Sequence, residues 1–494
     1  MSDSSSTTSP AIQRGWLLVL FAALCCKIVL VWGGGSRFAP DEFRYDHAIA
    51  FTHALSELEI AKAATVISTE PEHAGFTVLM LPAVVVQALV EPLTGQSPYE
   101  NDLPPLLLLS ACSIASLALL RAIALRLGLT QGQALLAAAL LAASLSWQRY
   151  SRHLLPYDLS IFLMLAGTWF RLRGGRPALL LSGALLGMAF LTYNGYWTAV
   201  GLLGAALFFC APCTAPKDWG LRATFLGTGF LAPILLFNIF SSLGGPSMLT
   251  GLGSFSATVN QGDWQDGGLI PIWYAWASDR ALVLVWVAWA LSLLFRAIRR
   301  NPIHRVEWGC VVLATLLWTL WFVGSNALEK FVVYGRLTRP ALPLLALGAA
   351  TWLAPHLAPS HRSAIPKLAG AGLLLIAAVN WWPAFRMQFP RETLSHLAAT
   401  DQSFRVDLTY EGPGLHAPEQ WTDPGAEHVF YNHRFLYPVV AWRPVPENPG
   451  TMLWSAPHPA SAPWNQYNGY TRKERTLLRE HPPEMMLYYR GESP

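Results

Sequence analysis

Charged side chains are scarce in this sequence. Only 13% of its 494 residues are Asp, Glu, Lys or Arg, whereas an ordinary soluble chain carries about 25%. Hydrophobic residues make up 53%, and apolar stretches approaching the roughly twenty residues of a membrane span recur along the first three quarters of the chain. This composition excludes an ordinary soluble protein and predicts a polytopic membrane protein.

A concentrated basic surface is also lacking. The formal net charge is only +4, and Lys and Arg fall mostly between the apolar stretches, where membrane topology explains them. We therefore expect a membrane partner and no nucleic-acid partner.

The few cysteines of this sequence predict neither a disulfide framework nor a structural zinc site. All six cysteines lie in or beside apolar stretches, and the Cys210–Cys213 pair has no second Cys or His pair nearby. The N-terminus has no small-residue cleavage site, so the first apolar stretch is expected to be retained.

Hydropathy predicts a mainly α, transmembrane helix bundle of about 11 spans. The expected spans are 15–32, 104–125, 132–147, 159–172, 178–193, 197–211, 221–240, 281–297, 308–325, 341–354 and 368–382.

One further apolar segment, 75–90, decides the topology. If it does not cross the membrane, the basic connections all lie on the inner side, as the positive-inside rule requires. These connections are 121–126, 171–176, 217–222, 296–305 and 361–367. We therefore predict that 75–90 is a re-entrant or juxtamembrane helix.

Three regions follow from this arrangement. Residues 1–14 are expected to form a disordered cytoplasmic N-terminus. Residues 15–384 form the membrane domain, with a long first outer loop at 33–103. Residues 385–494 have ordinary polarity and predict a small extracytoplasmic α/β domain, with helices near 391–400 and 471–480 and strands near 404–409, 428–431 and 485–489.

The first site expected from the residues is the acidic pair Asp41–Glu42, just past the first span. Adjacent carboxylates at a membrane surface suit a general base or a metal-binding or phosphate-binding group, although such pairs also occur in plain solvated loops. Arg44 and Tyr45 follow directly and favour a binding role.

Further ionisable residues fall on the same predicted outer side. Arg152 and Asp158 flank Pro156 between two spans, and Tyr193 lies in the next outer turn. Ionisable residues at a membrane boundary mark functional sites by default, although arginine also anchors at headgroups. We expect Arg152 and Asp158 to line a polar cavity.

Two more groups of polar residues complete the outer layer. Arg336 and Arg339 lie one turn apart and suit a phosphate or pyrophosphate, since guanidinium groups pair bidentately with such oxygens. Glu72 and His73 lie in the same outer loop as Asp41 and provide, with it, one option for a divalent metal ion; plain polar surface is the other.

The order of these motifs resembles the membrane-embedded GT-C glycosyltransferases, within them the protein mannosyltransferase and lipid A aminoarabinose transferase group. The resemblance covers about residues 15–353 and rests most on Pro-Asp-Glu-x-Arg-Tyr at 40–45 and on the stretch 336–343. Two positions depart from the family pattern. Tyr193 occupies a position where family members often have Lys, and Glu72-His73-Ala74 occupies one where the aminoarabinose transferases have Glu-Lys-Pro. The resemblance therefore leaves the identity of the sugar and of the acceptor open.

This resemblance implies a transferase that takes a sugar from a polyprenyl-phosphate donor and gives it to a lipid, glycan or protein acceptor. The reaction would occur on the non-cytoplasmic face, in a bacterial inner (plasma) membrane, with the site facing the periplasm or exterior. It implies Asp41 at the catalytic centre with Glu42 beside it, Asp158 closing the cavity and Arg336 facing the lipid phosphate.

Two other classes of function compete with a transferase. A transporter or flippase for lipid-linked sugars would also need many spans, but no internal repeat of the usual transporter kind is visible. A binding or assembly protein working through its C-terminal tail would not need so many spans as an anchor. The clustering of polar residues at one face favours the transferase.

Overall fold

A computed structural model describes most of the N-terminal three quarters of the chain. The described residues are 10–32, 44–69, 71–99, 101–210, 216–260, 270–324, 328 and 335–357, together with five short strands between 405 and 489. Asp41 and Glu42 and the predicted span 368–382 lie outside them.

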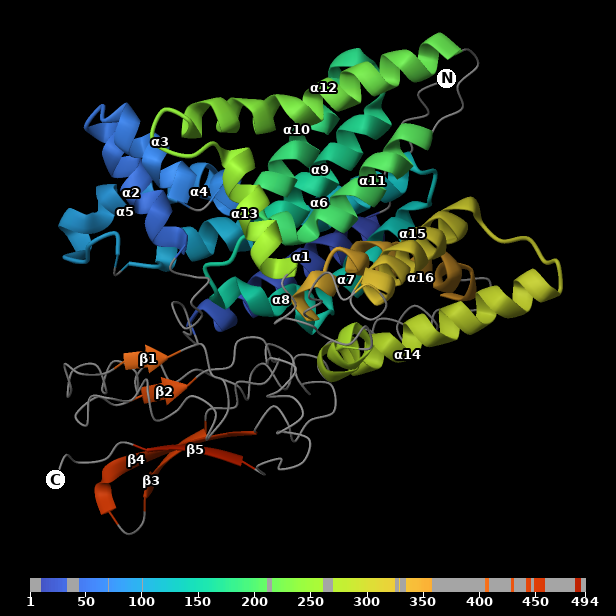
Figure 1. Cartoon of the computed structure of the whole chain (residues 1–494). Helices are drawn as coiled ribbons and strands as arrows, with labels where there is room; N and C mark the ends of the chain where they lie inside the picture. The colour runs from blue at the N-terminus through green and yellow to red at the C-terminus, as the bar shows by residue number, and fades with distance from the viewer. Residues whose placement is uncertain are drawn as a thin grey trace.

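The described part is mostly helical (Figure 1). The longer helices are α1 (Pro10–Trp32), α6 (Leu103–Arg126), α7 (Gln131–Ala142), α9 (Tyr157–Arg173), α10 (Arg176–Thr192), α11 (Trp197–Phe209), α12 (Pro216–Ser241), α14 (Ile270–Ile298), α15 (Arg305–Phe322) and α16 (Ala341–Leu357).

Shorter helices connect them. They are α2 (Arg44–Ser56), α3 (Ile60–Thr69), η2 (Pro71–His73), α4 (Ala74–Leu79), α5 (Leu81–Thr94), α8 (Leu145–Arg149), η3 (Tyr150–Arg152), η4 (Asn194–Tyr196), α13 (Met248–Asn260) and η6 (Gly335–Thr338).

Five described helices are long and apolar enough to cross a membrane: Pro10–Val31, Leu103–Arg126, Lys217–Ser241, Asp279–Ile298 and Arg305–Phe322. They leave large apolar side chains facing outward, with Leu236 66% exposed and Leu294 59% exposed. An apolar outer surface of this kind suits lipid rather than water. The helical membrane class predicted from composition is therefore supported.

The ambiguous segment 75–90 is a bent pair of helices. Helices α4 and α5 meet at a break at Met80 with an angle of 51°, which fits either a broken span or a re-entrant loop. Pro82, in the first turn of α5, starts the second helix where its missing N–H costs nothing.

The predicted span 132–147 is not one helix. Helix α7 ends at Ala142, and Ser144 caps a separate short helix α8 by accepting from the Trp147 N–H at 3.1 Å. The apolar sequence hid this break, because Ser144 competes for backbone hydrogen bonds without changing the hydropathy.

The first helix also begins earlier than expected. Helix α1 begins at Pro10, so residues 10–14, predicted to be disordered, are helical. Between α12 and α14 the chain forms helix α13, whose first turn is anchored because Ser241 and Asn238 accept from the Met248 and Leu249 N–H groups at 2.8 and 3.0 Å.

Glycine allows the closest helix packing in the bundle, where α10 and α12 run side by side (Figure 1). A Cβ at Gly183 or Gly187 would meet the backbone of α12 at Leu226 or Phe230, and one at Gly229 would meet Leu180 of α10. Small residues at a helix crossing let two backbones approach, as is usual between membrane helices.

Five strands are described near the C-terminus. β1 (Arg405–Asp407) pairs in parallel with β2 (His428–Phe430), and β3 (Ala441–Val445), β4 (Asn448–Pro457) and β5 (Met485–Tyr489) form an antiparallel sheet in that order. β1, β2 and β5 fall within stretches predicted as strands. The helices predicted at 391–400 and 471–480 lie outside the described residues.

Candidate functional site

A buried ion pair joins two helix starts that are far apart in the sequence. The Arg339 guanidinium, fully buried, donates from Nη2 to Oδ1 of Asp158, whose side chain is 2% exposed. Asp158 lies in the first turn of α9, which begins directly after Pro156, and a carboxylate there is favoured by the helix dipole. Arg339 comes just before α16.

The backbone around α8 holds the rest of the Arg339 side chain. Nε donates to the Ser146 carbonyl at 3.1 Å and Nη2 to the Trp147 carbonyl at 3.3 Å. The guanidinium also lies over the Tyr150 ring, 4.6 Å from its centroid. Burial alone would lower the pKa of Arg339, but the Asp158 carboxylate outweighs it and holds that pKa above its usual value. Arg339 is therefore always a cation.

A second cation, Lys27 of α1, reaches the same short helix. Its side chain is 1% exposed, and Nζ donates to the Trp147 and Gln148 carbonyls at 3.3 and 3.4 Å. Lys27, Asp158 and Arg339 form what we call the charged cluster. It contains two cations and one carboxylate, so its formal charge is +1.

Several buried polar atoms beside the charged cluster have no hydrogen-bond partner within the described residues. They are Arg339 Nη1, Trp147 Nε1, Gln148 Oε1 and Ser151 Oγ. Native proteins rarely leave such atoms unsatisfied, since each costs about 1–3 kcal/mol. A set of them beside excess positive charge favours the binding of a polar, anionic ligand.

Aromatic rings enclose the charged cluster on another side. Tyr157 packs edge-on against Tyr193 at 4.8 Å between centroids, and Tyr193 against Tyr196 at the same distance. Tyr193 also stacks on His73 at 5.8 Å. Burial raises the pKa of Tyr196 well above its usual value, so its hydroxyl stays protonated.

The residues that follow the acidic pair are anchored in the fold. Tyr45, fully buried in α2, donates to Gln87 Oε1 of α5 at 2.5 Å. Gln87 in turn donates to the Pro98 and Asn101 carbonyls at 2.9 and 2.5 Å. Tyr45, predicted to bind substrate, therefore ties the chain just after Asp41–Glu42 to the bent helix pair. Arg44 is half-buried at the start of α2.

Asp279 fixes the position of α8, the short helix that contacts the charged cluster. Its carboxylate accepts from the Leu145 N–H at 2.6 Å and from Ser144 Oγ at 3.0 Å. These bonds fix the first turn of α8, whose carbonyls hold both Lys27 and Arg339. Asp279 itself has a non-helical backbone that kinks α14.

The predicted metal set is only partly within the described residues. Asp41 lies outside them, Glu72 is half-buried, and the His73 imidazole is held by the Thr192 carbonyl at 3.3 Å and by Tyr193. Among the described residues, no three His, Cys, Asp or Glu side chains group as metal ligands do. A metal at Asp41, Glu72 and His73 stays a prediction.

The structure thus brings together Asp158, Tyr193 and Arg339 from the predicted set. The side chains of Arg152 and Arg336 lie outside the described part, although their backbones belong to η3 and η6. Sequence reasoning missed Lys27 and Asp279. A lysine inside an apolar stretch is itself a signal of function, so Lys27 could have been found.

No protein-family model matches the chain, and no curated protein matches its sequence. The function must therefore be argued from the residues and the geometry.

Proposed function

We propose that this chain is a GT-C-type membrane glycosyltransferase. It would transfer a sugar from a polyprenyl-phosphate-linked donor to a lipid, glycan or protein acceptor on the non-cytoplasmic face. The observation that carries the proposal is the charged cluster, in which Arg339 keeps one buried guanidinium nitrogen, Nη1, without a partner among the described residues.

The charge balance of the cluster favours an anion. Asp158 neutralises only one of the two cations, and burial strengthens the attraction of the remaining charge for a ligand. Arg339 Nη1 and Trp147 Nε1 are donors only, so each requires an acceptor oxygen. A phosphate supplies several such oxygens and pairs well with guanidinium.

The reaction places its developing charge on that phosphate. An acceptor hydroxyl or amine attacks the anomeric carbon, forming the new bond to the sugar while the bond from that carbon to the phosphate oxygen breaks. Asp41 takes the proton of the nucleophile, and polyprenyl phosphate leaves with the electron pair. Arg339 stabilises the negative charge that appears on the leaving oxygen, and we assign Arg336 to the same lipid phosphate. One displacement inverts the anomeric centre.

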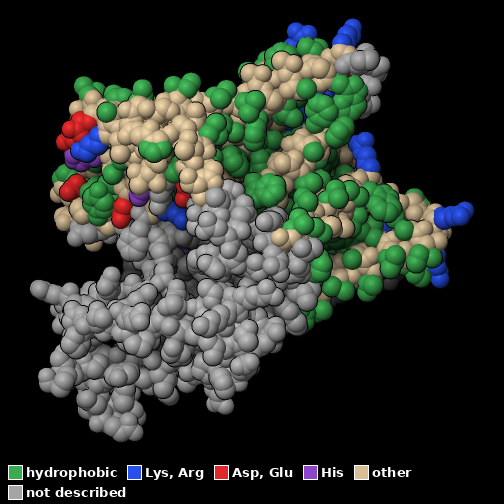
Figure 2. All heavy atoms as spheres, viewed as in Figure 1, with side chains coloured by type: hydrophobic (Ala, Val, Ile, Leu, Met, Phe, Trp, Pro, Cys, Tyr) green, Lys and Arg blue, Asp and Glu red, His purple; other side chains and the backbone are tan. Residues whose placement is uncertain are grey.

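The membrane arrangement is part of the proposal. Figure 2 shows Lys and Arg side chains without acidic ones at the end of the bundle where α12 begins and α14 ends, whereas acidic side chains gather at the opposite end, mixed with basic ones and with histidine. By the positive-inside rule the basic end faces the cytoplasm. The charged cluster would then lie toward the periplasm or exterior of a bacterial inner membrane.

In this proposal the membrane domain also includes residues beyond the described helices. The domain has about 11 spans. They are the five candidate spans, shorter apolar helices such as α7, α10 and α16, and residues 368–382. Residues 385–494 would form the extracytoplasmic α/β domain, with the five strands as its sheets.

A turnover assay in detergent separates a transferase from a flippase of lipid-linked sugars. Purified protein in detergent is given a polyprenyl-phosphate sugar and an acceptor extract, and released polyprenyl phosphate is measured. A transferase consumes the donor although no compartment exists. If the donor is left intact in detergent but moves across the bilayer of proteoliposomes, the flippase is correct and the proposal is wrong.

A further inference from the structure

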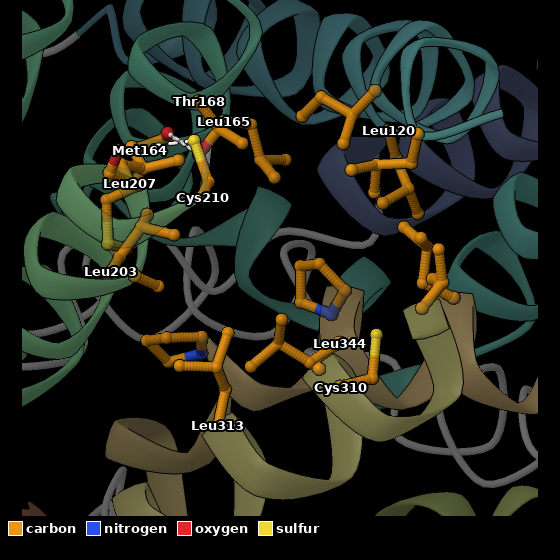
Figure 3. A pocket seen from close by; sticks show the side chains of 18 of the residues that line it. Leu120, Met164, Leu165, Thr168, Leu203, Leu207, Cys210, Cys310, Leu313 and Leu344 are labelled. Carbon is orange, nitrogen blue, oxygen red and sulfur yellow. Dashed lines mark hydrogen bonds between the residues drawn. The ribbon is translucent and has the colours of Figure 1, made fainter. Parts of the chain in front are cut away.

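The described helices enclose a cavity that lies apart from the residues of the charged cluster. A cavity of about 500 Å³ opens between α6, α9, α11, α15 and α16. Figure 3 shows apolar side chains entering it from all five helices, among them Leu120, Met164, Leu207, Leu313 and Leu344. None of the described residues that line it is acidic. Such a lining suits a hydrocarbon chain.

Two arginines form one mouth of this cavity. Arg126 ends α6 and Arg305 begins α15, and both line the cavity and are exposed. Arg305 donates from Nη2 to the Leu127 carbonyl at 3.3 Å, which places its guanidinium beside the end of α6. Neither arginine has a carboxylate partner within the described residues.

Two like charges beside each other repel unless an anion lies between them. Guanidinium groups pair bidentately with phosphate oxygens, and basic pockets between transmembrane helices on the cytoplasmic side bind anionic headgroups. The mouth therefore has the charge that a phospholipid headgroup needs, and the cavity behind it has the apolar walls that an acyl chain needs.

The length of the cavity matches one leaflet. Its lining along α15 runs from Arg305 to Leu317, a rise of about 18 Å in a helix. Half of a bilayer's hydrocarbon core is about 15 Å thick. One acyl chain that enters beside the two arginines would thus fill the cavity and end near the membrane midplane.

We propose that this cavity is a binding site for an anionic glycerophospholipid of the cytoplasmic leaflet, with its phosphate between Arg126 and Arg305 and one acyl chain among the leucines. The site requires no catalytic step, so it stands or falls independently of the transferase proposal. Pro340 also lines the cavity and follows Arg339 in the chain, so a lipid bound here would also touch the helix start that carries Arg339.

Native mass spectrometry of the purified full chain in neutral detergent tests the site. Phosphatidylglycerol and phosphatidylcholine with identical acyl chains are added in equal amounts, and the bound ratio is measured. We expect wild type to prefer phosphatidylglycerol, and the double variant Arg126→Gln/Arg305→Gln to lose about 30-fold of that preference, as two charges predict. Arg299→Gln, an exposed arginine outside the cavity lining, should keep it.

A second pair of variants tests the acyl-chain position with both arginines intact. Gly309 lines the cavity, and a side chain there meets open space, so Gly309→Leu should fill the cavity and lower the binding of both lipids. Gly201→Leu on α11 also meets open space but lies outside the lining, and should bind lipid as wild type does.

Three outcomes would overturn the proposal. Wild type could bind the two lipids equally, or the double arginine variant could keep its preference, or Gly309→Leu could bind as well as Gly201→Leu. The competing occupant is a polyprenyl phosphate that enters from the Arg339 end. Its phosphate would not reach Arg126 or Arg305, so the double arginine variant would keep the preference of the wild type.

Discussion

Asp158 and Arg339 are 181 positions apart in the sequence, yet they form an ion pair that is fully removed from solvent. The pair joins the start of α9 to the start of α16 and leaves Arg339 Nη1 available for a ligand. Both the stability of the bundle and the proposed binding of phosphate depend on this relationship.

Removing one partner of this ion pair should be costly. Asp158→Asn leaves the Arg339 cation buried and uncompensated, so we expect a loss of about 3–5 kcal/mol in the free energy of unfolding. Thermal or denaturant unfolding in detergent measures it. The double variant Asp158→Leu/Arg339→Met should recover much of the loss.

The control for this measurement is an exposed carboxylate. Glu59 pairs with Lys62 at 2.7 Å, with both side chains about half exposed, and Glu59→Gln should leave stability unchanged. Equal effects of Asp158→Asn and Glu59→Gln would contradict a structural role for the buried pair.

Lys27 should affect ligand binding more than folding. Lys27→Met keeps an unbranched side chain of similar length but removes the second cation of the charged cluster. Its hydrogen bonds go to the Trp147 and Gln148 carbonyls, so its removal takes the ion-pair partner from no carboxylate and relieves the cost of burying a charge. We expect unchanged or higher stability and a drop of about tenfold in kcat/KM for the polyprenyl-phosphate sugar, equal to about 1.4 kcal/mol. Unfolding and steady-state kinetics on one preparation separate the two effects. If the free energy of unfolding of Lys27→Met falls enough to explain the whole decrease in kcat/KM, Lys27 has no role in binding.

The sequence predicts the membrane-spanning helices better than it predicts the candidate site. Apolar length identified the candidate spans in α1, α6, α12, α14 and α15, since length and hydropathy define them. It could not place the break at Ser144, because one hydroxyl barely alters the hydropathy of its surroundings.

The charged cluster was only partly predictable. Asp158 and Arg339 stood out as ionisable residues at membrane boundaries, but their pairing depends on tertiary contacts that no local pattern encodes. Lys27 and Asp279 each gave a local signal, an ionisable residue in or next to an apolar stretch. Their shared partner, the short helix α8, became visible only in the structure.

The hydrogen bond from Tyr45 should hold the acidic loop in place. Tyr45→Phe leaves the buried Gln87 Oε1 without this donor, so we expect a loss of about 1–3 kcal/mol in stability. We also expect lower kcat, because the chain beside Asp41 is less well positioned. Tyr99→Phe is the matched control, since Tyr99 is 49% exposed. Full activity and stability of Tyr45→Phe would show that the bond is dispensable.

Close packing of α10 on α12 should tolerate no added side chain. Gly183→Ala places a Cβ against the Leu226 carbonyl and should lower stability by about 1–3 kcal/mol. Gly201→Ala meets open space and should be neutral or more stable by up to about 1 kcal/mol, since Ala favours helix more than Gly. Unfolding of the two variants in one detergent gives the comparison, and the reverse order would contradict the packing.

The most direct test of the transferase proposal is the stoichiometry of polyprenyl phosphate released and sugar transferred, measured for wild type and Asp41→Asn in detergent. We predict one phosphate released for each sugar transferred by wild type, and a rate about 10²–10⁴-fold lower for Asp41→Asn, the usual contribution of a general base. Full transfer activity in Asp41→Asn, or no release of polyprenyl phosphate by wild type, would contradict the account.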